Sequence, residues 1–296
     1  MGVLVLKIID IINSGKRSLS FEVFPPKTDD VYDSVKNATE EIAKLSPSFM
    51  SVTYGAGGGT SDYTLKIAEN IKKTYNVTSL AHLTCISSTK ETVKKMIEKF
   101  ESHGIENVMA LRGDIPKDRI DEDRSKWDYR YATDLIADIK KYAPQLSVGG
   151  ACYPEVHPES LSQEEDISNL KKKVEAGCEF LTTQMFFDNN LLYNFLYKIR
   201  QAGITVPVVA GIMPITNANQ VARSIKLSGS FMPQRFKSLV DKFGNDPLAM
   251  KQAGIAYATD QIIDLYANGI DAIHVYSMNK PEVAMKIQQN VSEIIK

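Results

Sequence analysis

One carboxylate in the sequence stands where a folding argument alone would not place it. Glu22 lies between Phe21 and Val23 in the apolar segment SLSFEVF, where a carboxylate is costly to bury unless it is partnered or protonated. An apolar environment would raise its pKa, which suits a general acid that works near neutral pH. A glutamate that faces outward and pairs with a helix lysine fits the same pattern, so both interpretations stay open at this point.

Polar groups also mark the ends of other apolar segments. A glycine cluster at 55–59 follows Thr53 and Tyr54; it could admit a phosphate to backbone N–H groups or simply form a flexible loop. His82 lies in the segment LAHLT, and a lone strand histidine is more often a satisfied core residue than a ligand. Three further candidates are RGD at 112–114, the proline-flanked loop YPEVHPE at 153–159, and Gln184, which needs a hydrogen-bond partner if it is buried.

The composition is that of an ordinary globular protein and argues against two classes of partner. Of 296 residues, 43% are hydrophobic and 24% charged, and a net charge of −1 offers no basic surface to nucleic acid or to a membrane. The three cysteines form no CxxC pair, so we interpret them as reduced thiols in a cytoplasmic protein. No HExxH, paired Cys–His spacing or carboxylate cluster predicts a metal site, and no GxSxG predicts a serine hydrolase.

The polar ends belong to short segments rich in β-branched residues, which alternate with longer amphipathic segments. The short segments predict strands at 18–24, 48–54, 78–84, 107–112, 147–153, 180–186, 206–211 and 271–276. The longer segments predict helices at 30–45, 61–75, 89–103, 131–142, 163–177, 189–202, 217–227 and 280–293. Gly104, Gly177 and Gly203 follow three of these segments, where a residue that ends a helix in the left-handed conformation is expected.

Eight strand–helix pairs in strict alternation predict an α/β fold, a single (β/α)8 TIM barrel with its active site at the C-terminal ends of the strands. The alternative, an open doubly wound sheet, would normally carry a glycine-rich fingerprint after the first strand, and FEVFPPK is not one. The first residues, MGVLVLKIIDIIN, predict an amphipathic N-terminal helix, and 233–243 and 247–268 predict extra helices between strands seven and eight. No linker or shift in composition interrupts the chain, which indicates one domain over residues 1–296.

Nine ordered blocks of sequence resemble the methylenetetrahydrofolate reductase family. They are SFEVFPPK, SVTYGAGG, AHLTC, ALRGD, YATDL, YPEVHPE, QMFFD, GIMPI and HVYSMN, and they span about residues 17–295 at the spacing of the family. The resemblance is to the short bacterial type, a catalytic barrel only. It implies non-covalently bound FAD, reduction of 5,10-methylenetetrahydrofolate to 5-methyltetrahydrofolate by NADH or NADPH, a role in one-carbon metabolism and methionine biosynthesis, and a homo-oligomer.

The resemblance also implies roles for individual residues. Glu22 corresponds to the general acid that protonates N10 of the folate, after which the 5-iminium cation accepts hydride from N5 of the reduced flavin. Asp114 corresponds to the carboxylate beside the flavin and the pterin, where it can stabilise that cation. Positions that match FAD contacts are Thr53, Tyr54, Ala56, His82, Arg112, Gly113, Asp114, Tyr131, Ala132, Tyr153, His157, Ser160, Asp166, Asn169, Lys172 and Lys173. Positions that match substrate or nicotinamide contacts are Glu22, Asp114, Gln184, Gln220 and Lys280.

Three positions depart from the family pattern and leave the electron donor open. Lys172 and Lys280 stand where arginines are expected, so a forked, bidentate donor becomes a point charge. Ser224 stands where a large apolar side chain usually covers the substrate face of the flavin. One alternative is therefore a flavin subunit of a larger complex that receives electrons from a partner protein. Another is a different FAD barrel, such as a proline-dehydrogenase-like enzyme.

Overall fold

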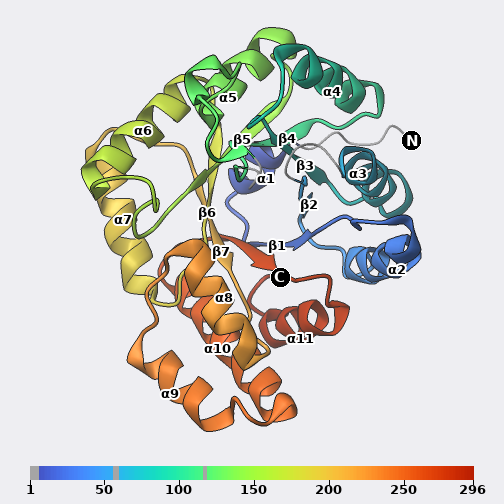
Figure 1. Cartoon of the computed structure of the whole chain (residues 1–296). Helices are drawn as coiled ribbons and strands as arrows, with labels where there is room; N and C mark the ends of the chain where they lie inside the picture. Colours follow the sequence, from blue (N-terminus) through green and yellow to red (C-terminus); the bar gives the residue numbers. More distant parts are fainter. Residues whose placement is uncertain (1–6, 56–59, 116–118) are drawn as a thin grey trace.

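Eight parallel strands close into a barrel in the computed structural model, which describes residues 7–55, 60–115 and 119–296 (Figure 1). Each strand pairs with the next one in the sequence, and β8 returns to pair with β1. The strands are β1 (Ser18–Val23), β2 (Met50–Val52), β3 (Ser79–Thr84), β4 (Asn107–Leu111), β5 (Ser147–Cys152), β6 (Phe180–Thr183), β7 (Val208–Ile212) and β8 (Ala272–Tyr276). The predicted (β/α)8 barrel is therefore confirmed.

A ring of helices surrounds the barrel, and α1 covers its N-terminal end (Figure 1). The helices are α1 (Ile8–Ile12), α2 (Tyr32–Ala43), α3 (Ser61–Tyr75), α4 (Lys90–Ser102), α5 (Ala132–Tyr142), α6 (Gln163–Glu175), α7 (Asn189–Gln201), α8 (Ala218–Ser228), α9 (Gln234–Phe243), α10 (Pro247–Ala267) and α11 (Pro281–Val291), with short 3-10 helices η1 (Asp29–Val31) and η4 (Arg124–Lys126). The two extra helices predicted between β7 and β8 are α9 and α10, and α10 packs against α7, α9 and α11. None of the helices in the described ranges is long and apolar enough to cross a membrane.

The alternation of side chains along β1 decides which way its carboxylate points. Leu19, Phe21 and Val23 belong to the apolar core between the barrel and the helices. Successive residues of a strand face opposite sides, so Ser20 and Glu22 point into the barrel. The outward-facing alternative for Glu22 is thereby excluded.

A separate apolar cluster and α1 close the N-terminal end of the barrel. Ile8 packs into a buried cluster with residues at or near the beginnings of the strands, namely Phe49, Leu80, Met109, Phe180, Val209 and Ala272. The backbone N–H of Ile8 donates to Asn107 Oδ1 at 2.9 Å, which anchors the start of the helix on β4. The predicted N-terminal helix is present from Ile8 onward, whereas residues 1–6 lie outside the described residues.

The sixth strand is shorter than the predicted 180–186. At its end, hydrogen bonds that involve side chains take the place of backbone hydrogen bonds between strands. The backbone N–H of Gly211 donates to the Thr183 hydroxyl oxygen at 2.8 Å, and the Thr183 carbonyl accepts from the Tyr276 hydroxyl at 2.5 Å. Gly211 makes this possible, because a Cβ there would lie 2.3 Å from Tyr276 Oη and 2.4 Å from the Thr183 carbonyl oxygen. The second strand, predicted at 48–54, is likewise shortened to Met50–Val52.

We expect Gly211→Ala to lower the free energy of unfolding by about 2–3 kcal/mol, because the added methyl group meets backbone that cannot move away. Gly203→Ala is the matched control: its φ of +82° is unfavourable for alanine, but no atom lies within 4 Å of the added Cβ. It should cost only about 1–2 kcal/mol. Equal losses for the two variants in urea denaturation would contradict the steric explanation.

Candidate active site

Glu22 lies at the C-terminal end of β1 and points into the mouth of the barrel, with its side chain 21% exposed. Burial raises the pKa of this carboxyl group from 4.5 to about 8, and a Ser51 hydroxyl hydrogen directed at it from the neighbouring strand would lower it. At neutral pH most Glu22 side chains are therefore carboxylic acids. A protonated carboxyl group at the mouth of a barrel has the properties of a general acid.

His82 is a titratable neighbour of Glu22. Its Nε2 lies 3.7 Å from Glu22 Oε2, and burial lowers the pKa of the imidazole to about 4. Since the pKa of Glu22 is about 8, both groups are neutral near pH 7 and the contact is not an ion pair. The Nε2 atom is buried without a hydrogen-bond partner in the described structure, which leaves one polar atom available to a ligand.

Beneath Glu22, the interior of the barrel carries a polar layer that was not predicted. Ser20, Ser51 and His274 are all almost completely buried, and their side chains are linked by hydrogen bonds. The signal was present in the sequence: in SLSFEV and AIHVY the polar residues occupy alternate positions, which places them on one face of a strand. What the pattern could not reveal is that these faces meet inside a closed barrel.

Four predicted cofactor contacts gather in the loop after β5 and in the first turn of α6. Tyr153 stacks edge-on against His157, with ring centroids 4.6 Å apart. Asp166 accepts from the backbone N–H of His157 at 3.0 Å and from the Ser160 hydroxyl at 3.4 Å. The loop is thus shaped by hydrogen bonds to a carboxylate in the first turn of α6.

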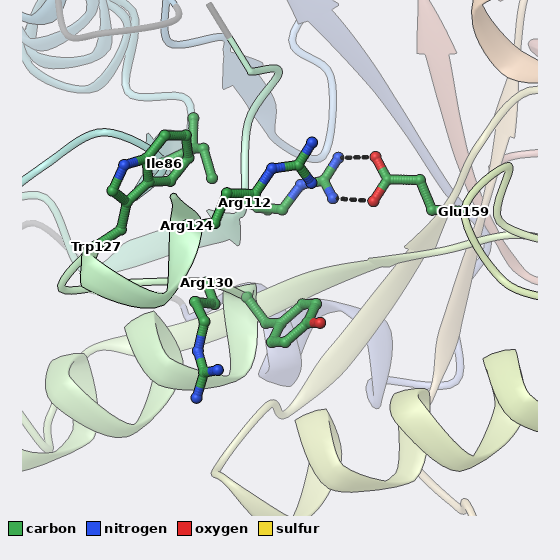
Figure 2. A pocket seen from close by; sticks show the side chains of 7 residues that line it. Ile86, Arg112, Arg124, Trp127, Arg130 and Glu159 are labelled. Atoms are coloured by element: carbon green, nitrogen blue, oxygen red, sulfur yellow. Dashed lines mark hydrogen bonds and ion pairs between the residues drawn. The ribbon is translucent and has the colours of Figure 1, made fainter. Parts of the chain in front are cut away.

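Arg112, just after β4, forms a two-pronged ion pair with Glu159 of this loop. The Nη1 and Nη2 atoms donate to the carboxylate at 2.5 and 2.8 Å, and this contact lowers the pKa of Glu159. Figure 2 shows Arg124 beside this pair and Trp127 at the other side of a pocket that all four residues line. A cationic pocket with an aromatic wall can bind a phosphorylated or aromatic group.

Further predicted FAD contacts lie at this pocket and directly after β4. Tyr131 lines the pocket and precedes α5, which Ala132 begins. Gly113 has a φ of +87° and leaves no room for a side chain, because a Cβ would lie 2.9 Å from Thr84 Cβ. Asp114 is exposed after β4.

Two further predicted contacts follow β2. Thr53 and Tyr54 are half-buried there, and burial raises the pKa of the Tyr54 hydroxyl. The predicted contact Ala56 lies outside the described residues.

The two lysines predicted to reach phosphates differ in their surroundings. Lys172 is exposed on α6, and its ammonium donates to Asn169 Oδ1 at 3.1 Å. Lys173 is half-buried and donates to the carbonyl of Ala151 on β5 at 2.6 Å. Lys172 and Asn169 thus form one exposed polar pair, whereas the Lys173 ammonium is held against the end of a strand.

The predicted substrate contacts near β7 converge on one threonine. Lys280 Nζ donates to Thr216 Oγ1 at 2.8 Å, and Gln220 Oε1 accepts from the Thr216 backbone N–H at 3.3 Å. Gln184 is half-buried after β6 and accepts from the next backbone N–H, that of Met185, at 2.8 Å. Its oxygen is therefore satisfied without a ligand. Across the described ranges, no group of three His, Cys, Asp or Glu side chains could hold a metal ion.

Comparison with known proteins identifies one family. Residues 7–292 match the family described as Methylenetetrahydrofolate reductase. Methylenetetrahydrofolate reductase (NADH) 1 from Zea mays is 33% identical over 298 residues, which make up 97% of this chain and 50% of that protein. The 5,10-methylenetetrahydrofolate reductase of Escherichia coli (strain K12) is 33% identical over 273 residues, 92% of this chain and 90% of that protein. The chain thus spans half the length of the plant relative and nine-tenths of the bacterial one.

A solved structure shares the fold. It is described as an uncharacterized protein from Clostridium thermocellum that binds two copies of 5-methyl-5,6,7,8-tetrahydrofolic acid. The match has a TM-score of 0.69 and covers 98% of this chain and 100% of that one. At 15% sequence identity the likeness is one of fold.

We expect Glu22→Gln to stabilise the protein at neutral pH. Above pH 4.5 the unfolded chain releases the Glu22 proton while the folded protein keeps it up to about pH 8, so this group costs stability as pH rises. At pH 7 the cost removed by glutamine is about 2–3 kcal/mol.

The pH dependence supplies the control for this variant. Denaturant unfolding should show no stabilisation well below pH 4.5, where the carboxyl group is protonated in both states, and a growing one toward pH 8. The buried neutral imidazoles of His82 and His274 reduce stability below pH 6.5 in both proteins alike, so they cancel in the difference. A stability difference independent of pH would show that Glu22 is ionised in the folded protein.

Proposed function

Because the chain belongs to the methylenetetrahydrofolate reductase family, we propose that it reduces 5,10-methylenetetrahydrofolate to 5-methyltetrahydrofolate with bound FAD and with NADH or NADPH as electron donor. The observation that carries the proposal is the buried carboxyl group of Glu22 at the C-terminal mouth of the barrel, where burial raises its pKa to about 8. Opening the five-membered ring of the substrate requires a proton on N10, and Glu22 holds one at neutral pH.

The residues around the mouth fit a flavin dinucleotide. The Arg112–Arg124 pocket is cationic and has aromatic side chains, Trp127 and Tyr131, for a purine. Gly113 allows close approach to the backbone after β4, and His82 offers an unpaired buried nitrogen. When bound, FAD supplies the hydride that the substrate receives.

Each part of the chain then has a defined task toward the cofactor and the folate. Arg112 and Lys172 would hold the phosphates of the cofactor. The segment with Tyr153, His157, Ser160 and Asp166 would form the wall of the binding site between these two side chains. Asp114 lies exposed after β4, where its charge stabilises a cationic pterin. Gln184, Gln220 and Lys280 bind the folate or the nicotinamide. The folate-binding structural neighbour and the relative named for NADH support this choice of ligands.

The reaction is tested with the purified protein reconstituted with FAD. We expect NADH or NADPH to bleach the flavin absorption under anaerobic conditions, and 5,10-methylenetetrahydrofolate to restore it. Failure to bind FAD would contradict the proposal. A flavin that only a reduced partner protein bleaches would instead indicate a subunit of a larger complex, which the serine at position 224 motivates.

Glu22→Gln should separate the two half-reactions. Glutamine keeps the shape of the side chain but has no acidic proton, so reduction of the flavin by the nicotinamide should stay within about twofold of the wild type. Reoxidation by the folate should fall by at least about 100-fold, the usual contribution of general acid catalysis. Stopped-flow absorbance measures both steps, and an equal loss in the two would reject Glu22 as the proton donor.

Glu159→Gln should tighten FAD binding by about three- to tenfold, because the variant frees the Arg112 guanidinium for a phosphate at a cost typical of a partly exposed ion pair. Glu175→Gln, an exposed change of the same charge at the end of α6, is the control. Titration by flavin fluorescence gives the dissociation constants. Weaker binding to the Glu159 variant would show that the ion pair forms part of the binding surface instead of competing with it.

A further inference from the structure

A string of three buried side chains runs beneath Glu22 inside the barrel. Ser20 Oγ lies 2.7 Å from His274 Nδ1, and His274 Nε2 lies 2.9 Å from Ser51 Oγ. Ser51 is the register partner of Glu22 on the next strand, and its hydroxyl acts on the Glu22 carboxyl group. The relative exposures of Ser20 and Ser51 are 0% and that of His274 is 2%, so these groups must satisfy one another without bulk water.

The direction of the string depends on where Ser20 sends its single hydrogen. Donation to the Ile273 carbonyl at 2.9 Å leaves the Ser20 oxygen to accept from His274 Nδ1–H, whereas donation to Nδ1 itself, at 2.7 Å, would reverse the string; we adopt the first arrangement. Burial lowers the pKa of His274 to about 3, which keeps the ring neutral with one N–H. Its Nε2 atom is therefore an acceptor, and the hydrogen it accepts comes from Ser51.

With the hydrogen bonds in this direction, the ionised form of Glu22 receives no hydrogen bond from Ser51. A Ser51 hydroxyl directed at Glu22 would lower the pKa of the carboxyl group, but its hydrogen is committed to His274. Ser51 then presents only lone pairs to Glu22, and lone pairs match the O–H of a carboxylic acid.

The two other titratable groups that face Glu22 supply no positive charge. His82 on β3 is neutral near pH 7, since burial lowers its pKa to about 4. Tyr276 on β8, the register partner of Glu22 on that side, donates its hydroxyl hydrogen to the Thr183 carbonyl at 2.5 Å. In the described part of the structure, the surroundings of Glu22 therefore match its protonated form.

We propose that His274 is a positioning residue that, held by Ser20 and acting through Ser51, keeps Glu22 in the protonated form that donates to the substrate. The inference deepens the proposed function, on which the role of the proton rests. After Glu22 has given up its proton, rotation of the Ser51 hydroxyl toward the carboxylate is the one local change that supplies a donor from this string.

The tautomer of His274 is the direct test, and it needs neither FAD nor folate. Nitrogen-15 NMR of the full-length protein distinguishes the two ring nitrogens, and with four histidines in the chain a His274→Asn sample assigns the signals. We expect His274 to be neutral with its hydrogen on Nδ1. A hydrogen on Nε2 would reverse every bond in the string, direct the Ser51 hydrogen to Glu22 and overturn the proposal.

A matched pair of variants tests the effect on Glu22. The carbonyl stretch of the protonated Glu22 acid, assigned by its loss in Glu22→Gln, can be titrated in the infrared. His274→Asn retains a donor near Ser20 but no acceptor near Ser51, so the released hydroxyl should lower the pKa of Glu22 by about one. His274→Gln, which can place an oxygen near Ser51, should restore most of the lost pKa. His103→Asn, at the C-cap of α4, is the control and should leave the pKa of Glu22 unchanged.

Ser51→Ala distinguishes most clearly whether the Ser51 hydrogen is donated to His274 or to Glu22. If the Ser51 hydrogen is committed to His274, the pKa of Glu22 stays unchanged or falls slightly. A rise would show that Ser51 donates to the carboxylate, and the proposal would be rejected. If the NMR and infrared results agree with the proposal but the protein does not turn over the folate, the proposed function fails and the assignment of His274 stands.

Discussion

The closed parallel barrel imposes one constraint on which everything else depends: every second side chain of each strand points into a space without bulk water. In this protein that space is apolar only at its N-terminal end, where α1 and a layer with Phe49 and Phe180 fill it. Above this layer lie Ser20, Ser51 and His274, whose side chains are hydrogen-bonded to one another, and His82, whose Nε2 has no partner in the described structure. The barrel is thus a polar interior closed at one end and open at the mouth.

The same constraint explains why Glu22 keeps its proton near neutral pH. Glu22 stands at the boundary between the buried string and the mouth, and no nearby group of the described structure carries a compensating positive charge. Burial therefore keeps its proton in place near neutral pH, at a cost to the folded state. Such a cost is typical of functional sites, where local preferences yield to chemistry. The large apolar core around the barrel, which includes Leu19, Phe21 and Val23, offsets it.

The cofactor side of the mouth is organised by loops instead of by strands. Arg112 and Glu159 come from different βα loops, and their ion pair joins two segments that the sequence separates by 47 positions. Lys172 and Lys173 are adjacent in the sequence, yet one is exposed and the other is held against Ala151. The family resemblance implies a cofactor contact for both lysines, because a sequence motif gives the positions of residues but not the directions of their side chains. Helix geometry turns adjacent residues about 100° apart, which is enough to separate their surroundings.

The sequence by itself determined the order and number of the strands, the extra helices between β7 and β8, the helix-ending glycines at 104, 177 and 203, and the family, because these depend on local periodicity and on ordered motifs. It also singled out Glu22 as a carboxylate in an apolar segment. Only the tertiary structure decided that Glu22 points inward, that Ser51 and His274 lie beneath it, and that β6 ends at Thr183. These features arise from contacts between residues as far apart as 20 and 274, and no local pattern encodes which strand faces meet when the sheet closes.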